Sequence, residues 1–183
     1  EELVSQCIGR NEGRLTDSGA LSINTGEFTG RCPKDRYLVK DAISADTVDW
    51  NSFNQPMEEK QFDLIFHQVT AYLHQLPEIW VRDSYACADP AYRLNLRVIT
   101  ETPAMSLFAY NMFLRPEDEG FKPTWHILAA PGLKLDPVQC GVRQPNAVII
   151  SLKHQLILLA GTGYTGEIKK SVFSVLNYLL PFQ

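Results

Sequence analysis

The sequence predicts one domain of the mixed α/β class, in which a mixed sheet is flanked by helices. Stretches with apolar residues at every third or fourth position alternate irregularly with short apolar or alternating runs that are typical of strands. The chain has 183 residues, of which 45% are hydrophobic and 21% charged, and this suffices for one sizeable core. We therefore expect residues 1–183 to form a single domain without internal repeats.

The first half of the chain predicts short strands and one long helix. Residues 2–8 are expected to end a helix, and strands are expected at 21–23 and 36–40 with a loop bearing Gly and Pro between them. Residues 50–56 are predicted to form a loop. Apolar side chains recur at helical spacing from residue 58 to residue 76, and Pro77 is expected to end this helix.

The second half predicts strands that alternate with two further helices. Strands are expected at 78–82, 92–100 and 124–130, and a helix is expected at 104–113 between Pro103 and Pro116. The apolar stretch 147–160 predicts two strands joined at 153–155. A closing helix is expected at 167–180, ended by Pro181.

Composition argues against several classes of partner. The net charge is −4 and the charges are interspersed, so neither nucleic acid nor membrane is expected as a partner. No apolar run reaches the roughly 18–20 residues that span a bilayer. The four cysteines lie far apart and are expected to be reduced thiols in a cytoplasmic protein. Because the chain opens on Glu1 rather than Met, we expect it to be a piece of a longer protein.

The stretch 158–171, "LLAGTGYTGEIKKS", partly matches two phosphate-binding patterns. The dinucleotide pattern requires a second strand and an acidic residue further on, whereas only a helix is predicted after Gly166. The P-loop pattern requires Lys and Ser or Thr where Glu167 and Ile168 stand. Two interpretations stay open: a strand-to-helix turn with solvated lysines, or an anion or metal–anion site where backbone amides, Lys169 and Lys170 converge.

A second cationic stretch, "FTGRCPKDRY" at 28–37, places Arg31, Lys34 and Arg36 around one acid, Asp35. Arginine is suited to bidentate capture of a carboxylate, so this stretch favours the anion-site interpretation. Taken alone, such a loop is more often solvated. The position of Cys32 beside Arg31 allows a lowered pKa of its thiol.

Together the two stretches resemble ATP-dependent phosphoenolpyruvate carboxykinase. "TGRCPKDRY" is similar to that family's T-G-R-S-P-K-D-K/R loop, and "GTGYTGEIKKSVFSVLNYLLP" is similar to its G-T-x-Y-x-G-E-[IM]-K-K segment and the helix that follows. "YACADPAYRLNLRVITE" and "LFAYNMFLRP" resemble two further blocks that lie between them in the same order. Cys32 stands where Ser is usual, and Gly163 stands where Ser or Trp is common.

The resemblance covers the family's N-terminal, substrate-side domain, so it implies a carboxykinase N-terminal-domain fold. The family's P-loop and its metal-binding His and Asp belong to a second, C-terminal domain, and no complete G-x-x-x-x-G-K-[ST] occurs in this sequence. The implied reaction of the whole enzyme converts oxaloacetate and ATP to phosphoenolpyruvate, CO₂ and ADP in gluconeogenesis. It uses Mn²⁺, and Mg²⁺ with the nucleotide.

The resemblance also implies a role for each matching residue. Arg31 holds the substrate carboxylate, Tyr164 contacts the substrate, and Lys170 ligates Mn²⁺ and touches the substrate and the γ-phosphate. Lys169 is the second choice for this last role, and stabilisation of the helix N-terminus is the simplest account of Glu167. The implied partners are oxaloacetate or phosphoenolpyruvate and the enzyme's own C-terminal nucleotide-binding domain. Alone, the chain is expected to bind neither metal nor ATP tightly and to be inactive.

Two alternatives stay open at this point. The chain is either a stand-alone module that binds or senses small anions without kinase chemistry, or a structural domain whose cationic loops are vestigial. Arg31, Tyr164 and Lys170 are all present, which favours an anion-binding role over a purely structural one.

Overall fold

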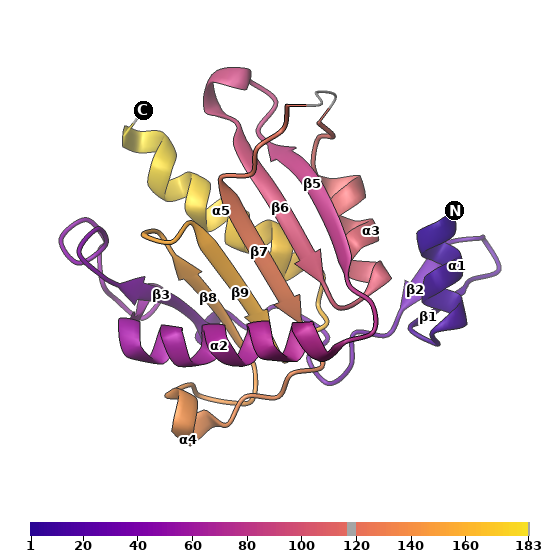
Figure 1. The fold of residues 1–183 in the computed structure, drawn as a ribbon, viewed down its shortest axis with the longest axis horizontal. Helices are drawn as coiled ribbons and strands as arrows, with labels where there is room; N and C mark the ends of the chain where they lie inside the picture. Colours follow the sequence, from indigo (N-terminus) through magenta and orange to yellow (C-terminus); the bar gives the residue numbers. More distant parts are fainter. Residues whose placement is uncertain (117–119, 183) are drawn as a thin grey trace.

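A computed structural model of the protein describes residues 1–116 and 120–182; residues 117–119 and 183 of the expected domain lie outside the described part. Within it, a mixed seven-stranded sheet has the strand order β4-β3-β8-β9-β7-β6-β5. Helices cover both faces of this sheet (Figure 1). The predicted class, a mixed sheet flanked by helices, is confirmed.

The directions of the strands decide which loops share an edge of the sheet. β6, β7 and β9 run parallel to one another, β8 is antiparallel to β9, and β3 is parallel to β8. The end of β9 and the start of β3 therefore lie at the same edge, the lower one in Figure 1. The strands of the sheet are β3 (Arg36–Lys40), β4 (Gln55–Glu58), β5 (Trp80–Ala86), β6 (Leu94–Thr100), β7 (Trp125–Ala130), β8 (Ala147–Ser151) and β9 (Leu156–Ala160).

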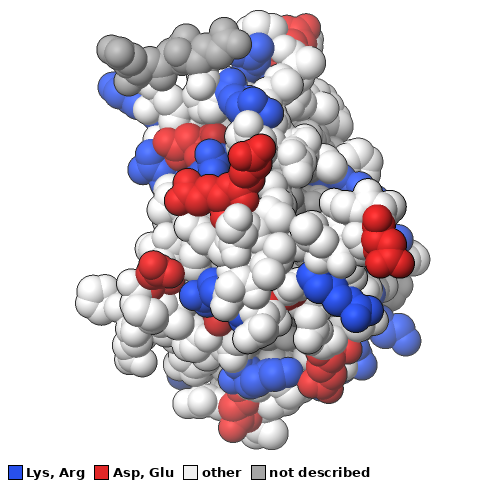
Figure 2. Space-filling model, turned by 90° about the vertical axis from the view of Figure 1, so that its right-hand side faces the viewer, with Lys and Arg blue, Asp and Glu red and all other residues white. Residues whose placement is uncertain are grey.

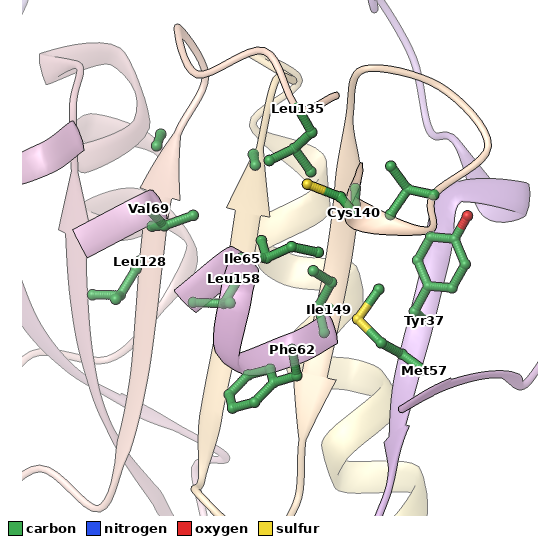
Figure 3. Close-up of a cluster of buried hydrophobic side chains, with 14 of the residues drawn as sticks. Tyr37, Met57, Phe62, Ile65, Val69, Leu128, Leu135, Cys140, Ile149 and Leu158 are labelled. Carbon is green, nitrogen blue, oxygen red and sulfur yellow. The ribbon is translucent and has the colours of Figure 1, made fainter. Parts of the chain in front are cut away.

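One face of the sheet is covered by α2 (Glu59–Gln75), which lies across the strands in Figure 1. It begins with a capping box, in which the side chains of Glu58 and Gln61 satisfy backbone amides at the helix start. Its buried residues, Phe62, Ile65, Val69 and Leu73, follow the helical repeat and form one stripe. Figure 3 shows part of this stripe packed on Ile149 and Leu158 of the sheet.

The other face is covered by α3 (Pro103–Met112) and α5 (Gly166–Leu179). Met105 of α3 and Ile168 and Val172 of α5 belong to the same buried cluster beneath the sheet. Because helices cover both faces, every residue of β8 and β9 is buried. This explains why residues 147–160 form two almost uninterrupted apolar runs rather than alternating ones.

Smaller elements lie at the periphery. α1 (Glu2–Gly9) and the hairpin of β1 (Gly13–Leu15) and β2 (Leu21–Ile23) lie beside α3, and α4 (Pro137–Cys140) lies at the lower edge (Figure 1). On the face that carries the N-terminal helix, residues of both charge signs are intermixed (Figure 2). Within residues 1–116 and 120–182, no helix has both the length and the hydrophobicity needed to cross a membrane.

Two sequence predictions require correction. Residues 50–56 are not all loop, because Gln55 and Pro56 belong to β4, which pairs in parallel with β3. Proline is tolerated there because β4 is an edge strand. The strand expected at 78–82 begins at Trp80 and extends to Ala86, because it pairs with the whole of β6. β1 and α4 were not expected.

Candidate functional site

The glycine loop, residues 161–165, joins the end of β9 to the start of α5. The amides of Glu167 and Ile168 donate to the carbonyl oxygens of Tyr164 and Thr165, both at 3.1 Å. The amide of Tyr164 donates to the Thr162 hydroxyl at 3.3 Å. Because these amides are already hydrogen-bonded, fewer of them face outward than the anion-site interpretation assumed.

Two glycines of this segment permit close packing. A Cβ atom on Gly163 would lie 2.7 Å from the carbonyl oxygen of Thr25. Because glycine has no Cβ atom, the backbone at Thr25 can approach the glycine loop this closely. A Cβ atom on Gly166 would lie 2.7 Å from a ring carbon of Tyr164. The Tyr164 ring therefore lies against the first turn of α5, and this glycine is needed to place the tyrosine there.

The cationic loop, residues 28–35, leads into β3 and is anchored by a buried acid. Asp35 is fully buried and accepts a fork of two hydrogen bonds from Arg143, each 2.8 Å long. The side-chain amide of Gln144 donates to the same carboxylate at 2.6 Å. This charge-assisted pairing ties the loop to the segment that precedes β8.

Glu167 joins the cationic loop to the first turn of α5. Its side chain is 1% exposed; one carboxylate oxygen accepts from the Cys32 amide at 3.1 Å and the other from the Arg36 guanidinium at 2.9 Å. Arg36 also donates to the Ser174 hydroxyl at 3.2 Å. The carboxylate therefore does more than stabilise the helix N-terminus, and Arg36 is occupied within the protein rather than free for a ligand.

The remaining predicted site residues lie around this junction. Arg31 and Lys169 are exposed, while Tyr164 and Lys170 are half-buried. The ammonium of Lys170 lies 5.3 Å from the centre of the Phe173 ring, within the range of a cation–π contact. The structure thus brings the segments that carry Arg31, Tyr164 and the two lysines together at one edge of the sheet. Asp35 is buried and Arg36 is half-buried, and both make hydrogen bonds within the protein.

The sequence allowed a lowered pKa for the Cys32 thiol, and this interpretation is wrong. Burial raises the pKa of its thiol above the usual value, and the nearby carboxylates of Asp35 and Glu167 raise it further. The thiol also lies 3.6 Å from the carbonyl oxygen of Gly30, in hydrogen-bonding range. Position next to Arg31 in sequence does not imply a lowered pKa, because desolvation dominates at this place.

Glu101 was missed by the sequence analysis. It follows the end of β6, and its carboxylate accepts from the Tyr72 hydroxyl at 2.7 Å and from the Gly132 amide at 2.8 Å. It lines a cavity of about 280 Å³ at the same edge, together with Gly161 and Gly163 but not Arg31, Tyr164 or Lys170. Its position at the carboxyl end of a parallel strand was the one available signal.

An exposed arginine and a half-buried tyrosine on loops, with two lysines in the first turns of α5, lie at one edge of a mixed α/β sheet, an arrangement suited to small anionic ligands. Comparison with known proteins makes this specific. The family model described as phosphoenolpyruvate carboxykinase matches residues 1–183, so the chain belongs to the phosphoenolpyruvate carboxykinase family.

Curated relatives agree with this assignment. The chain is 50% identical over 99% of its length to a protein of Christiangramia forsetii named phosphoenolpyruvate carboxykinase (ATP). Proteins of the same name from Geobacillus kaustophilus and Staphylococcus aureus strain Newman are 43% and 44% identical over the whole chain. The chain spans about a third of the length of these relatives, 34–35%.

Proposed function

We propose that this chain is the substrate-side part of an ATP-dependent phosphoenolpyruvate carboxykinase, which converts oxaloacetate and ATP to phosphoenolpyruvate, CO₂ and ADP. The supporting observation is the direct contact of the cationic loop with the first turn of α5 through Glu167. Two segments about 130 residues apart in sequence, each similar to a substrate-binding motif of the family, are thereby joined at one edge of the sheet. In this proposal the whole enzyme is cytoplasmic and acts in gluconeogenesis.

In this proposal, Arg31 binds the carboxylate of oxaloacetate. Loss of CO₂ from oxaloacetate leaves an enolate, and a fixed guanidinium can both orient the anion and stabilise the developing charge. Tyr164 lies on the same loop system, where its hydroxyl can donate to the carboxylate or to phosphoenolpyruvate. The arginine, being always charged, needs no proton transfer to act.

The metal and nucleotide would depend on groups beyond these residues. In the part of the chain that the structure describes, no three His, Cys, Asp or Glu side chains are placed to share a metal ion. Lys170 is the proposed Mn²⁺ ligand, and Lys169 is the second candidate for this role. One amine is not a complete coordination set. The family's nucleotide domain would supply the other ligands and the site for ATP with Mg²⁺.

The first test is a titration of the isotopically labelled chain with oxalate, a planar dianion that resembles the enolate, followed by nuclear magnetic resonance. We expect signals of residues 28–35 and 161–170 to shift together. Arg31→Gln should weaken binding at least about tenfold, because a charge-assisted bidentate contact contributes on the order of 1.5–3 kcal/mol.

Lys34→Gln is the matched control, since Lys34 is an exposed cation of the same loop. It should change the affinity by less than about threefold, because it removes only a screened surface charge. Equal losses in the two variants would show a diffuse electrostatic attraction instead of a site. A lack of any shift at millimolar oxalate would overturn the proposal, and binding of other small dianions in preference to oxalate would favour a regulatory module.

A further inference from the structure

The carboxylate of Glu167 is shared between the cationic loop and the first residue of β3. Its Oε1 holds the amide of Cys32, the residue directly after Arg31, and its Oε2 holds the guanidinium of Arg36 at the start of β3. The side chain is buried to 99%, so both hydrogen bonds are shielded from water. One acid of α5 thus fixes both ends of the short segment from residue 32 to residue 36.

We propose that Glu167 is a positioning residue that sets the placement of Arg31 relative to Tyr164 and Lys170. This inference rests on the proposed function and adds to it a residue that does not touch the substrate. Glu167 lies in the first turn of α5, three residues after Tyr164 and three before Lys170 in sequence. A shift of this turn moves the tyrosine and the lysine, and the two hydrogen bonds of Glu167 make the cationic loop follow.

A second buried acid, Asp35, connects the cationic loop to a different part of the fold. Asp35 binds Arg143 and Gln144, which precede β8, and so fixes the loop to the sheet but not to α5. Arg36 completes the connection to the helix, since its second guanidinium nitrogen donates to Ser174, two turns further along α5. Glu167 and Arg36 therefore fix the cationic loop relative to α5. Asp35 fixes the loop relative to the segment before β8.

The expected effect follows from the two hydrogen bonds that the Glu167 carboxylate accepts. Glu167→Gln keeps the length of the side chain and one acceptor oxygen, but it turns an amide NH₂ group toward one of the two donors. The loop loses either the Cys32 or the Arg36 contact. Because displacement of a binding group by about 1 Å can cost up to about a hundredfold, we expect oxalate affinity to fall about tenfold while the fold is kept.

The experiment measures oxalate affinity by the same titration in the wild-type chain, Glu167→Gln, Arg36→Gln and the double variant, each well below its unfolding temperature. If Glu167 acts through Arg36, the double variant should lose much less affinity than the sum of the single losses. Hydrogen exchange of the Cys32 amide should be faster in Glu167→Gln. This readout reports the contact itself, and a general loss of stability would accelerate exchange elsewhere as well.

Glu59→Gln is the control, because it removes a carboxylate that pairs with Lys153 at the surface of α2. It should leave oxalate affinity unchanged. Ser174→Ala serves if Glu167→Gln does not fold, because it loosens Arg36 without leaving a buried charge unpaired. It should weaken binding only about two- to threefold, because the contact of Arg36 with Glu167 is kept.

The outcomes separate the two proposals. If the wild-type chain does not bind oxalate, the proposed function fails. If the wild-type chain binds oxalate and folded Glu167→Gln binds it equally well, the positioning role fails and the proposed function stands. The same holds if Ser174→Ala, used in its place, matches the wild type. Additive losses in the double variant would likewise overturn the action of Glu167 through Arg36.

Discussion

At the scale of the residue, burial outweighs sequence neighbours in deciding the chemistry of Cys32. The thiol is partly covered, and the carboxylates of Asp35 and Glu167 add negative potential. Both effects disfavour the thiolate. Arg143 opposes them through space, and a hydrogen bond with Asn146 does so directly, but neither overcomes the cost of desolvation. Burial and the two carboxylates therefore favour the neutral thiol of Cys32.

A thiol of this kind should be alkylated slowly at neutral pH. In a Cys87→Ser background, which removes the other partly exposed thiol, the rate of reaction of Cys32 with iodoacetamide should rise with pH to a midpoint above 9.0, the ordinary value for cysteine. Arg31→Gln should leave the midpoint nearly unchanged, because burial is its main cause. A midpoint below 9.0, or a large dependence on Arg31, would contradict this account.

At the scale of the element, Glu101 connects α2 to the edge of the sheet. It accepts from the Tyr72 hydroxyl of α2 and from the Gly132 amide, which follows β7. Burial, with a smaller contribution from the hydrogen bond to Glu101, raises the pKa of Tyr72 to about 12. The ionised tyrosine is thus disfavoured in the folded protein, where it would face the Glu101 carboxylate.

The pH dependence of stability follows from this shift. Because the pKa of Tyr72 in the folded state, about 12, lies above the value of about 10 for an unfolded chain, the contribution of the neutral hydroxyl is complete below pH 10. It is lost progressively as the pH rises from 10 toward 12. The free energy of unfolding, measured by urea denaturation from pH 9 to 11, should therefore fall more steeply in the wild type than in Tyr72→Phe.

Tyr92→Phe is the control for this measurement, because Tyr92 is 45% exposed. This variant should show the same pH dependence as the wild type. If Tyr72→Phe also follows the wild type between pH 9 and 11, the hydroxyl is not held in its neutral form by burial and Glu101.

Elements with a strong local pattern could be predicted from the sequence, and those formed by pairing could not. α2 and α5 have apolar stripes at helical spacing, and β8 and β9 are apolar runs separated by a turn. β4 has no alternation and contains Pro56; it is a strand only because β3 lies beside it. A strand at an edge of the sheet depends on a partner that the local sequence does not specify.

The same distinction applies to the candidate site. Arg31, Tyr164 and Lys170 could be found because they stand in recognisable motifs. Their roles in binding are predictions of the proposed function. The connection between these segments could not be predicted, because Glu167 and Arg36 are 131 residues apart and each is plausible locally as a solvated charge. Only the antiparallel relation of β3 and β9 brings them to one edge.

At the scale of the whole molecule, the proposal divides the reaction between this chain and the larger remainder that its relatives possess. The proposed substrate contacts come from Arg31 and Tyr164, and Lys170 is the proposed amine ligand of the metal. The sequence contains no complete P-loop, and the chain spans 34% of the length of the Christiangramia forsetii relative. A phosphoryl transfer needs the triphosphate held by backbone amides and a lysine and neutralised by Mg²⁺. In this proposal the 183 residues position the substrate, and the remainder of the enzyme activates ATP.

The isolated chain should thus bind oxalate but form no phosphoenolpyruvate from oxaloacetate and ATP in the presence of Mn²⁺ and Mg²⁺. The measurement is the amount of phosphoenolpyruvate formed, rather than CO₂ released, because metal ions alone decarboxylate oxaloacetate in solution. The full-length Geobacillus kaustophilus relative, named phosphoenolpyruvate carboxykinase (ATP), serves as the positive control. Formation of phosphoenolpyruvate by the chain above the control without protein would show that residues 1–183 bind and activate the nucleotide themselves, and the division proposed here would be wrong.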